Sequence, residues 1–199
     1  MADHEKCGAN EDTLLHVDAA NPERSVTKSQ ARILTKQLAH GLRHEYGVGT
    51  DGPGKDVIMV MCSGQAFLPL LFYGVIAAGG IYSALSNSAT VAELSNQLAQ
   101  NPVSLLVCSP DTKAVAVKAA EKSGLSETKI LVLETGADFS LRSVSTGRNC
   151  VSEKQLDWTK ITDPTELENS LACLLYSSGT TGPPKGMLPS EDYKQHDRN

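Results

Sequence analysis

The sequence predicts an α/β fold with a mostly parallel sheet, and three observations lead to this class. Short apolar runs of strand length alternate with amphipathic stretches of helix length along the 199 residues. Capping pairs, prolines and glycines mark the expected helix ends. The composition, 40% hydrophobic and 21% charged, is ordinary for a globular protein. We expect alternating β-α-β units over residues 13–188, after a disordered N-terminus at 1–12 and before a polar tail at 189–199.

The first predicted helix has the clearest start signal. After a short strand at residues 13–17 and a turn at 21–23, Thr27 and Gln30 have the spacing of a capping box. One apolar face follows at helical spacing, made of Ala31, Leu34, Leu38 and Leu42. The helix is expected to end near Tyr46 and Gly47.

Five apolar runs are predicted to be strands, at residues 56–62, 81–84, 103–108, 129–133 and 171–176. Between them we expect a buried helix that ends at Gly79 and Gly80, and a helix opened by the capping pair Thr90 and Glu93. A further helix is expected to begin at Ser109 and to end before Gly124. Residues 134–168 are predicted to be an irregular polar connection, with Trp158 as an aromatic anchor.

One uncharged stretch raises the question of a membrane span. No charged residue occurs from residue 57 to residue 92, and residues 66–85 are long enough to cross a bilayer. Pro69 and three glycines interrupt this stretch, and no basic residues flank it closely. We therefore expect a buried strand followed by a buried helix, with a transmembrane helix as the alternative.

Charge and cysteine usage limit the classes of partner. The net charge of −5, with no lysine or arginine run, argues against nucleic-acid binding. Five scattered cysteines without a C-x-x-C spacing favour free thiols in a reducing compartment. No apolar core of a signal peptide is seen near residue 1, and the last three residues are no peroxisomal signal.

Two local patterns could be read as binding sites. His40 and His44 have the i, i+4 spacing of metal ligands, but helix geometry turns them away from the apolar face and no third ligand is evident. We expect them to face solvent and predict no metal site. Residues 52–55 contain Gly-Pro-Gly-Lys, but they precede a strand, so a turn is expected there.

The strongest functional signal is the loop after the last predicted strand, residues 176–186, which reads Tyr-Ser-Ser-Gly-Thr-Thr-Gly-Pro-Pro-Lys-Gly. Glycines let successive backbone N–H groups form a cradle for anions, and short hydroxyls add donors. Lys185 adds a positive charge suited to phosphate oxygens. The spacing differs from the common P-loop, because Pro183 and Pro184 separate Gly182 from the lysine. The predicted phosphate ligands are Ser177, Ser178, Gly179, Thr180, Thr181, Gly182 and Lys185.

This loop closely resembles the phosphate-loop signature of the adenylate-forming (AMP-binding) superfamily, in the branch of acyl-CoA synthetases and 4-coumarate-CoA ligases. A weaker resemblance covers residues 79–84 and 90–98. The resemblance implies an incomplete N-terminal subdomain of an ATP-dependent acid–thiol ligase that activates a carboxylate as an acyl-adenylate. It also implies ATP, Mg²⁺, coenzyme A and a small carboxylic acid as ligands, in a cytoplasmic or peroxisomal protein.

The family pattern continues beyond the loop in ways that this sequence does not repeat. Met187 and Leu188 are expected to begin the strand that follows the loop in the family, but Pro189 interrupts it, and Glu191 stands where the family favours histidine. The resemblance places the acyl pocket, the adenine contacts and the catalytic lysine downstream, so we expect these 199 residues alone to be inactive. No catalytic residue is assigned. A non-catalytic truncated product, an incorrect gene prediction and a simple nucleotide-binding module remain as alternatives.

Overall fold

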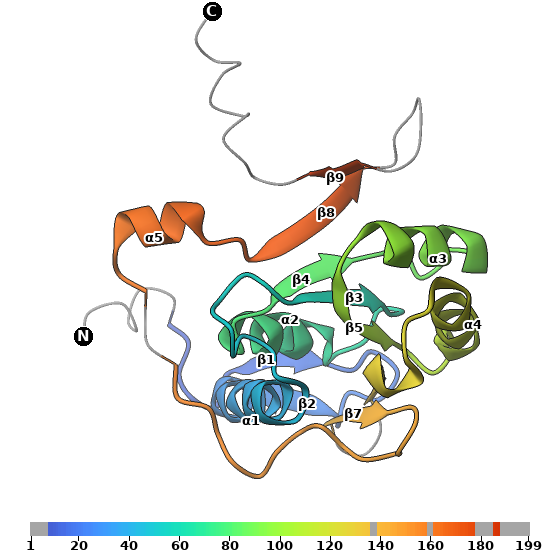
Figure 1. Ribbon diagram of the computed structural model, residues 1–199. Helices are drawn as coiled ribbons and strands as arrows, with labels where there is room; N and C mark the ends of the chain where they lie inside the picture. The colour runs from blue at the N-terminus through green and yellow to red at the C-terminus, as the bar shows by residue number, and fades with distance from the viewer. Residues whose placement is uncertain (1–7, 136–138, 159–160, 178–184, 188–199) are drawn as a thin grey trace, which may run out of the picture.

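The fold is a seven-stranded sheet between two pairs of helices, seen in a computed structural model that describes residues 8–135, 139–158, 161–177 and 185–187. Within these residues the strand order is β7-β6-β5-β3-β4-β8-β9, and β6, β5, β3, β4 and β8 run parallel. The two edge strands, β7 and β9, are antiparallel to their neighbours. The predicted α/β class with a mostly parallel sheet is confirmed (Figure 1).

The strands of this sheet are β3 (Val57–Met61), β4 (Ile81–Ala84), β5 (Val103–Cys108), β6 (Ile130–Thr135), β7 (Phe139–Ser143), β8 (Cys173–Ser177) and β9 (Lys185–Met187). Ahead of the sheet, β1 (Leu14–Val17) and β2 (Ser25–Thr27) form a separate hairpin. The helices are α1 (Lys28–Tyr46), α2 (Leu68–Ala77), α3 (Val91–Gln100), α4 (Lys113–Ser123) and α5 (Pro164–Asn169), and a 3₁₀ turn covers Glu127–Lys129.

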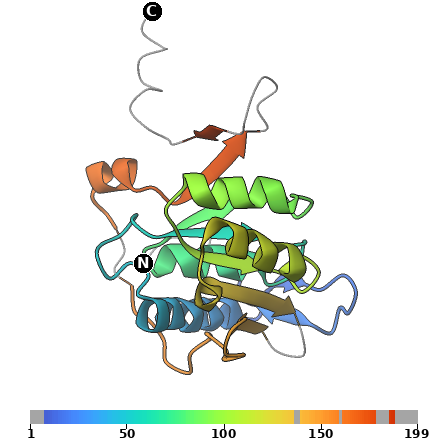
Figure 2. The same cartoon turned by 45° about the vertical axis from the view of Figure 1, so that its right-hand side comes forward.

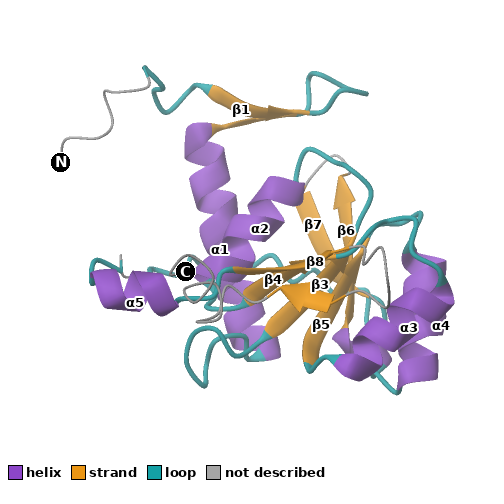
Figure 3. Cartoon of the chain, turned by 90° about the horizontal axis from the view of Figure 1, so that it is seen from above, coloured by secondary structure: helices purple, strands orange, loops and turns teal. Residues whose placement is uncertain are grey.

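Helices cover both faces of the sheet. Viewed from above, α1 and α2 lie on one side of the strands and α3 and α4 on the other (Figure 3). Turning the molecule brings α3 and α4 forward, side by side (Figure 2). Strand β3 explains the two layers, because its side chains alternate between two cores. Ile58 and Val60 pack with α1 and α2, whereas Met59 and Met61 pack with α3 and α4.

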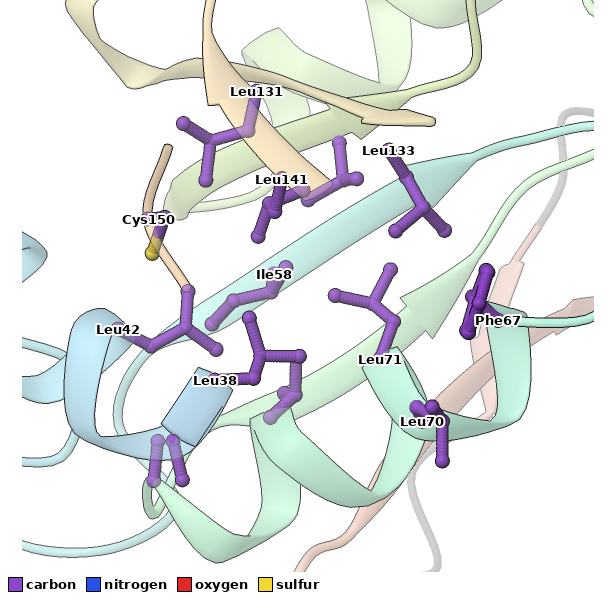
Figure 4. Packing of buried hydrophobic residues seen from close by; sticks show 14 of the residues in the cluster. Leu38, Leu42, Ile58, Phe67, Leu70, Leu71, Leu131, Leu133, Leu141 and Cys150 are labelled. Carbon is purple, nitrogen blue, oxygen red and sulfur yellow. The ribbon is translucent and has the colours of Figure 1, made fainter. Parts of the chain in front are cut away.

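The core on the α1 side is closed by the chain that follows β7. Leu38 and Leu42 of α1 point toward Ile58 and Leu71, and Cys150 lies at the edge of the same cluster (Figure 4). Residues 149–158, which we call the α1 strap, run along the helix: the amide of Ser152 donates to the carbonyl of Gln37 at 3.3 Å, and that of Leu156 donates to the carbonyl of Lys36 at 3.0 Å. The strap therefore holds α1 against the sheet.

Both predicted capping boxes are confirmed. Thr27 and Gln30 exchange hydrogen bonds at the start of α1, and Thr90 and Glu93 do so at the start of α3. Each box satisfies two N–H groups that an uncapped helix would leave unpaired. The predicted end of α1 is also confirmed, because Gly47 adopts φ 72°, which favours glycine.

Three local predictions were wrong. Residues 134–168 contain β7 and α5, which are not an irregular connection. Helix α4 begins at Lys113, after the predicted start at Ser109, because residues 109–112 form a turn. The strand after the glycine-rich loop begins at Lys185, two residues before Met187.

The start of the described chain contacts α1. Of the segment predicted to be disordered, residues 1–7 lie beyond what the structure describes. Glu11 pairs with Arg32 at 2.9 Å, and its carbonyl accepts from the amide of Ser29 at 3.0 Å. The boundary at residue 12 stays a prediction.

Candidate functional site

The glycine-rich loop leaves the sheet at β8 and returns at β9. In the antiparallel pairing of these strands, Ser177 is the register partner of Lys185, and Tyr176 is the partner of Gly186. Five predicted phosphate ligands, Ser178, Gly179, Thr180, Thr181 and Gly182, lie outside the described residues. The backbone therefore brings together the first and last predicted ligands, one on each strand.

The loop begins at the edge of the sheet where ligands of open α/β folds bind. Strand β8 pairs in parallel with β4, so Ser177 ends β8 at the same edge where β3, β4 and β5 end. Strands β3 and β5 are neighbours in the sheet. The chain leaving β3 continues to β4, away from β5, and the chain leaving β5 continues to β6, away from β3, so the direction of the connections reverses between β3 and β5. Such a reversal leaves a crevice outside the carboxyl ends of the two strands.

Polar residues from the loops after β3, β4 and β5 form hydrogen bonds with one another where the connections reverse, and we call them the carboxyl-edge cluster. The Ser63 amide, after β3, donates to Ser109 Oγ, after β5, at 3.0 Å. The Ser63 hydroxyl donates to Asp111 Oδ2 at 2.5 Å, and Asn87 Nδ2, after β4, donates to Ser63 Oγ at 3.1 Å. Thr112 Oγ1 donates to the carbonyl of Met61 at 2.7 Å. Side chains from three loops are thus joined at one edge.

This cluster also explains why α4 begins late. Ser109 was predicted to cap the helix, but its hydroxyl accepts from Ser63 and lies 3.1 Å from Thr112 Oγ1. The sequence carried one sign of this cluster, namely polar residues directly after several predicted strands. Their separation in the sequence, by 24 residues between Ser63 and Asn87, hid the contact.

Hydrogen bonds from Ser109 and Ser63 lower the pKa of Asp111 below its ordinary value of 3.8. A carboxyl whose pKa is lower in the folded chain stabilises the fold at pH values above its unfolded pKa. That contribution is lost as the pH falls through the folded pKa.

We therefore predict that Asp111→Asn lowers the free energy of unfolding at neutral pH, by less than about 1 kcal/mol because the side chain is exposed. The difference from the unchanged chain should shrink below about pH 4. Urea unfolding at several pH values measures it. Asn87→Ala is the control, since it removes a neutral member of the same cluster and should give a difference that does not titrate. A pH-independent loss for Asp111→Asn would contradict the prediction.

The histidine pair does not lie as predicted. His44 is exposed, but His40 is partly buried, and its Nδ1 atom is buried without a hydrogen-bond partner among the described residues. Their ring centroids are 4.1 Å apart. Burial and the neighbouring His44 lower the pKa of His40. In the described part of the chain, no three His, Cys, Asp or Glu side chains form a group that could hold a metal ion.

The thiols at the carboxyl edge are poor nucleophiles. Cys62, Cys108, Cys150 and Cys173 are free, as predicted, and Cys7 lies among the residues that the structure does not describe. Burial raises the pKa of Cys62 well above its ordinary value and raises that of Cys108 to about 12. Because the thiolate is the reactive form, neither cysteine suits covalent chemistry.

Helix α2, which occupies the uncharged stretch, is a short helix packed on the sheet. Across the described ranges, no helix is both long enough and apolar enough to cross a membrane. The expectation of a buried strand followed by a buried helix is confirmed by β3 and α2.

Comparison with known proteins identifies relatives over nearly the whole chain. Residues 4–193 match the family of AMP-binding enzymes. A protein of Emericella nidulans named "Putative acyl-coenzyme A synthetase" is 47% identical over 90% of this chain and 33% of its own length. The phenylacetyl-CoA ligase epaB of Aspergillus niger is 30% identical over 86% of this chain and 31% of its own length. The chain spans about a third of the length of these curated relatives.

Solved structures share the fold at low sequence identity. ATP-bound MatB from Rhodopseudomonas palustris aligns with a TM-score of 0.64 at 21% identity, over 89% of this chain and 31% of that one. A long-chain-fatty-acid-CoA ligase from Archaeoglobus fulgidus aligns with a TM-score of 0.63 at 20% identity, over 81% of this chain and 29% of that one. At these identities, the likeness establishes the fold alone.

Proposed function

Because this chain belongs to the AMP-binding enzyme family, we propose that it is the N-terminal part of an ATP-dependent acid–thiol ligase. In this proposal residues 13–188 are part of the adenylation domain, and the loop at 176–186 binds the β- and γ-phosphates of ATP. The acid is a small-molecule carboxylate, and coenzyme A is the thiol. The proposed compartment is the cytoplasm or the peroxisome. These proposals rest on the family and on the chemistry of the loop.

One observation carries the assignment of the loop. Ser177 and Lys185 are register partners at the end of β8 and the start of β9, at the carboxyl edge of the parallel strands. A hydroxyl residue and a lysine thus begin and end a loop that contains two glycines and three further hydroxyls. Backbone N–H groups in such a loop can cradle phosphate oxygens, and a lysine supplies a point charge. The donor set fits the triphosphate of ATP.

The proposed work of these residues is electrostatic. The carboxylate of the acid attacks the α-phosphate of ATP and pyrophosphate leaves; the thiol then attacks the acyl carbon of the acyl-adenylate, which forms the thioester and releases AMP. Ser177, Ser178, Thr180 and Thr181 would donate hydrogen bonds to the leaving pyrophosphate, and Lys185 would neutralise part of its charge. Donors fixed in advance stabilise charge as it develops on the leaving group. No general base or nucleophile is needed from this part of the chain.

Mg²⁺ and coenzyme A complete the set of proposed ligands. Mg²⁺ would neutralise phosphate charge when bound, and it prefers carboxylate and water oxygens. The described residues include no cluster of three carboxylate, imidazole or thiol ligands for it. No residue is assigned to coenzyme A. Both ligands are proposed from the family alone.

We predict that the 199-residue chain does not exchange radiolabelled pyrophosphate into ATP with any carboxylic acid. The proposed phosphate ligands between Ser177 and Lys185 would hold the phosphates of ATP, whereas attack on the α-phosphate also requires a pocket that orients the acid. The measurement is an exchange assay over a panel of aromatic and aliphatic acids, with a full-length ligase as positive control. Robust exchange by the purified chain would show that these residues form a complete adenylation site and would contradict the prediction.

A further inference from the structure

A polar hollow with a volume of about 820 Å³ lies beside the C-terminal part of α1. It is bounded by this helix, by the turn after β7 and by the α1 strap. His40 and His44 line it from the helix, and Ser152 and Lys154 line it from the α1 strap. His40 therefore lies where the α1 strap meets the helix.

The α1 strap contacts the face of α1 to which His40 belongs. The carbonyl of Gln37 accepts a hydrogen bond from the amide of Ser152 at 3.3 Å, and Gly41 lies against the backbone of Cys150. His40 follows Gln37 by three residues and Gly41 follows it by four, so the three residues share one face of the helix. A change at His40 can therefore act directly on the contact between the helix and the α1 strap.

The surroundings of His40 favour its neutral form. Its Nδ1 atom is buried and has no hydrogen-bond partner among the described residues. In a neutral imidazole one of the two ring nitrogens carries no proton, whereas in the cation both carry an N–H group. A buried N–H group without an acceptor costs free energy, which a nitrogen without a proton avoids more cheaply. Protonation of His40 is therefore unfavourable while its Nδ1 atom stays buried.

The charges around His40 act mostly in the same direction. Burial lowers the pKa of His40, and so do His44, whose ring centroid is 4.1 Å away, and Lys154 of the α1 strap. Glu45 raises this pKa, but its carboxylate pairs with Arg148 at 3.1 Å. The other ionisable side chains that line the hollow, among the described residues, are Tyr46 and Glu153.

We propose that His40 is a pH-sensitive latch for the α1 strap, which lies closed on α1 while His40 is neutral and opens more often once His40 is protonated. Opening gives water access to the imidazolium and moves Lys154 away from it. In the open state, the pKa of His40 returns toward its ordinary value of 6.5. His40 therefore stabilises the closed state above about pH 6.5, and this contribution is lost as the pH falls from there through the closed-state pKa.

Amide hydrogen exchange of the 199-residue chain measures how often the α1 strap opens. The reporters are the amides of Ser152 and Leu156, which donate to the carbonyls of Gln37 and Lys36. After correction for the intrinsic exchange rate, both amides should lose protection as the pH falls from about 7 to about 5. The amides of β3, at the centre of the sheet, are the reference and should keep their protection over this range.

Three histidine variants locate the titrating group. His40→Gln keeps a neutral polar side chain and should abolish the loss of protection at low pH. His44→Gln removes only the neighbouring ring and should reduce this loss without abolishing it, because Lys154 and burial still act on His40. His16→Gln is the matched control, since His16 belongs to β1 and is not among the residues that line the hollow. It should leave the loss unchanged.

Other results would overturn the proposal. Equal protection of Ser152 and Leu156 at the two pH values would refute it, as would a loss that persists in His40→Gln. A parallel loss at the amides of β3 would mean that acid loosens the whole fold, without a latch. An effect of His16→Gln as large as that of His40→Gln would assign the titration to another part of the chain. Ser177 and Lys185 do not line the hollow, so none of these results bears on the phosphate loop.

Discussion

Replacing Gly41 with alanine is expected to destabilise the fold by about 3 kcal/mol or more. A Cβ atom at this position would lie 1.7 Å from the carbonyl oxygen of Cys150, well inside van der Waals contact. Alanine is favoured over glycine inside a helix by about 1 kcal/mol, so the clash has to outweigh that gain. The clash outweighs the gain because the Cβ atom would meet the backbone of Cys150, which cannot rotate away as a side chain can. The amide of Cys150 donates to the carbonyl of Leu141 at 2.7 Å and so holds this backbone in place. The α1 strap would have to leave the helix.

Urea unfolding followed by circular dichroism measures this loss. Gly64→Ala is the matched control, since an added Cβ there meets no atom within 4 Å. Its free energy of unfolding should change by no more than about 0.5 kcal/mol. Equal stability of the two variants would mean that the α1 strap does not pack on Gly41 as the structure describes.

The second large effect is expected on ligand binding. Lys185→Ala should weaken pyrophosphate binding about tenfold or more, because a charge-assisted hydrogen bond contributes about 1.5–3 kcal/mol. Lys185 starts β9 directly opposite Ser177, so its backbone position is fixed by strand pairing. Isothermal titration calorimetry with pyrophosphate measures the change. The unfolding curve should be nearly unaltered, since the expected loss is of a ligand contact.

Two other lysines serve as controls for this effect. Lys118 is exposed on α4, and Lys118→Ala should leave pyrophosphate affinity unchanged. Lys55 belongs to the glycine-rich turn before β3, which was rejected as a phosphate site. A loss of affinity in Lys55→Ala, with Lys185→Ala unaffected, would move the phosphate site to that turn.

Local signals predicted most of the sheet and the helices. Strands β4 and β5 have the expected bounds, because each is a short apolar run between turn or capping residues. Strand β7 was missed, since Phe139–Ser143 alternates apolar and polar residues too briefly to stand out. It is a strand because it pairs antiparallel with β6, the strand directly before it in the chain, and a five-residue run gives little local sign of that pairing. The three-residue β2 was missed for the same reason.

The functional site also has one part that could be predicted from the sequence and one part that could not. The loop could be found from the sequence because its glycines, hydroxyls and lysine are contiguous. The carboxyl-edge cluster could not, because Ser63, Asn87 and Asp111 meet only after β3, β4 and β5 have paired.

The central claim is that the loop between β8 and β9 binds the phosphates of ATP. The most direct measurement is the chemical shift of each backbone amide during titration with pyrophosphate. The account predicts saturating shifts at Gly179, Thr180, Thr181 and Gly182, with Kd values that agree with one another. Unchanged shifts at these amides, with saturating shifts at Gly52 and Gly54 instead, would contradict it.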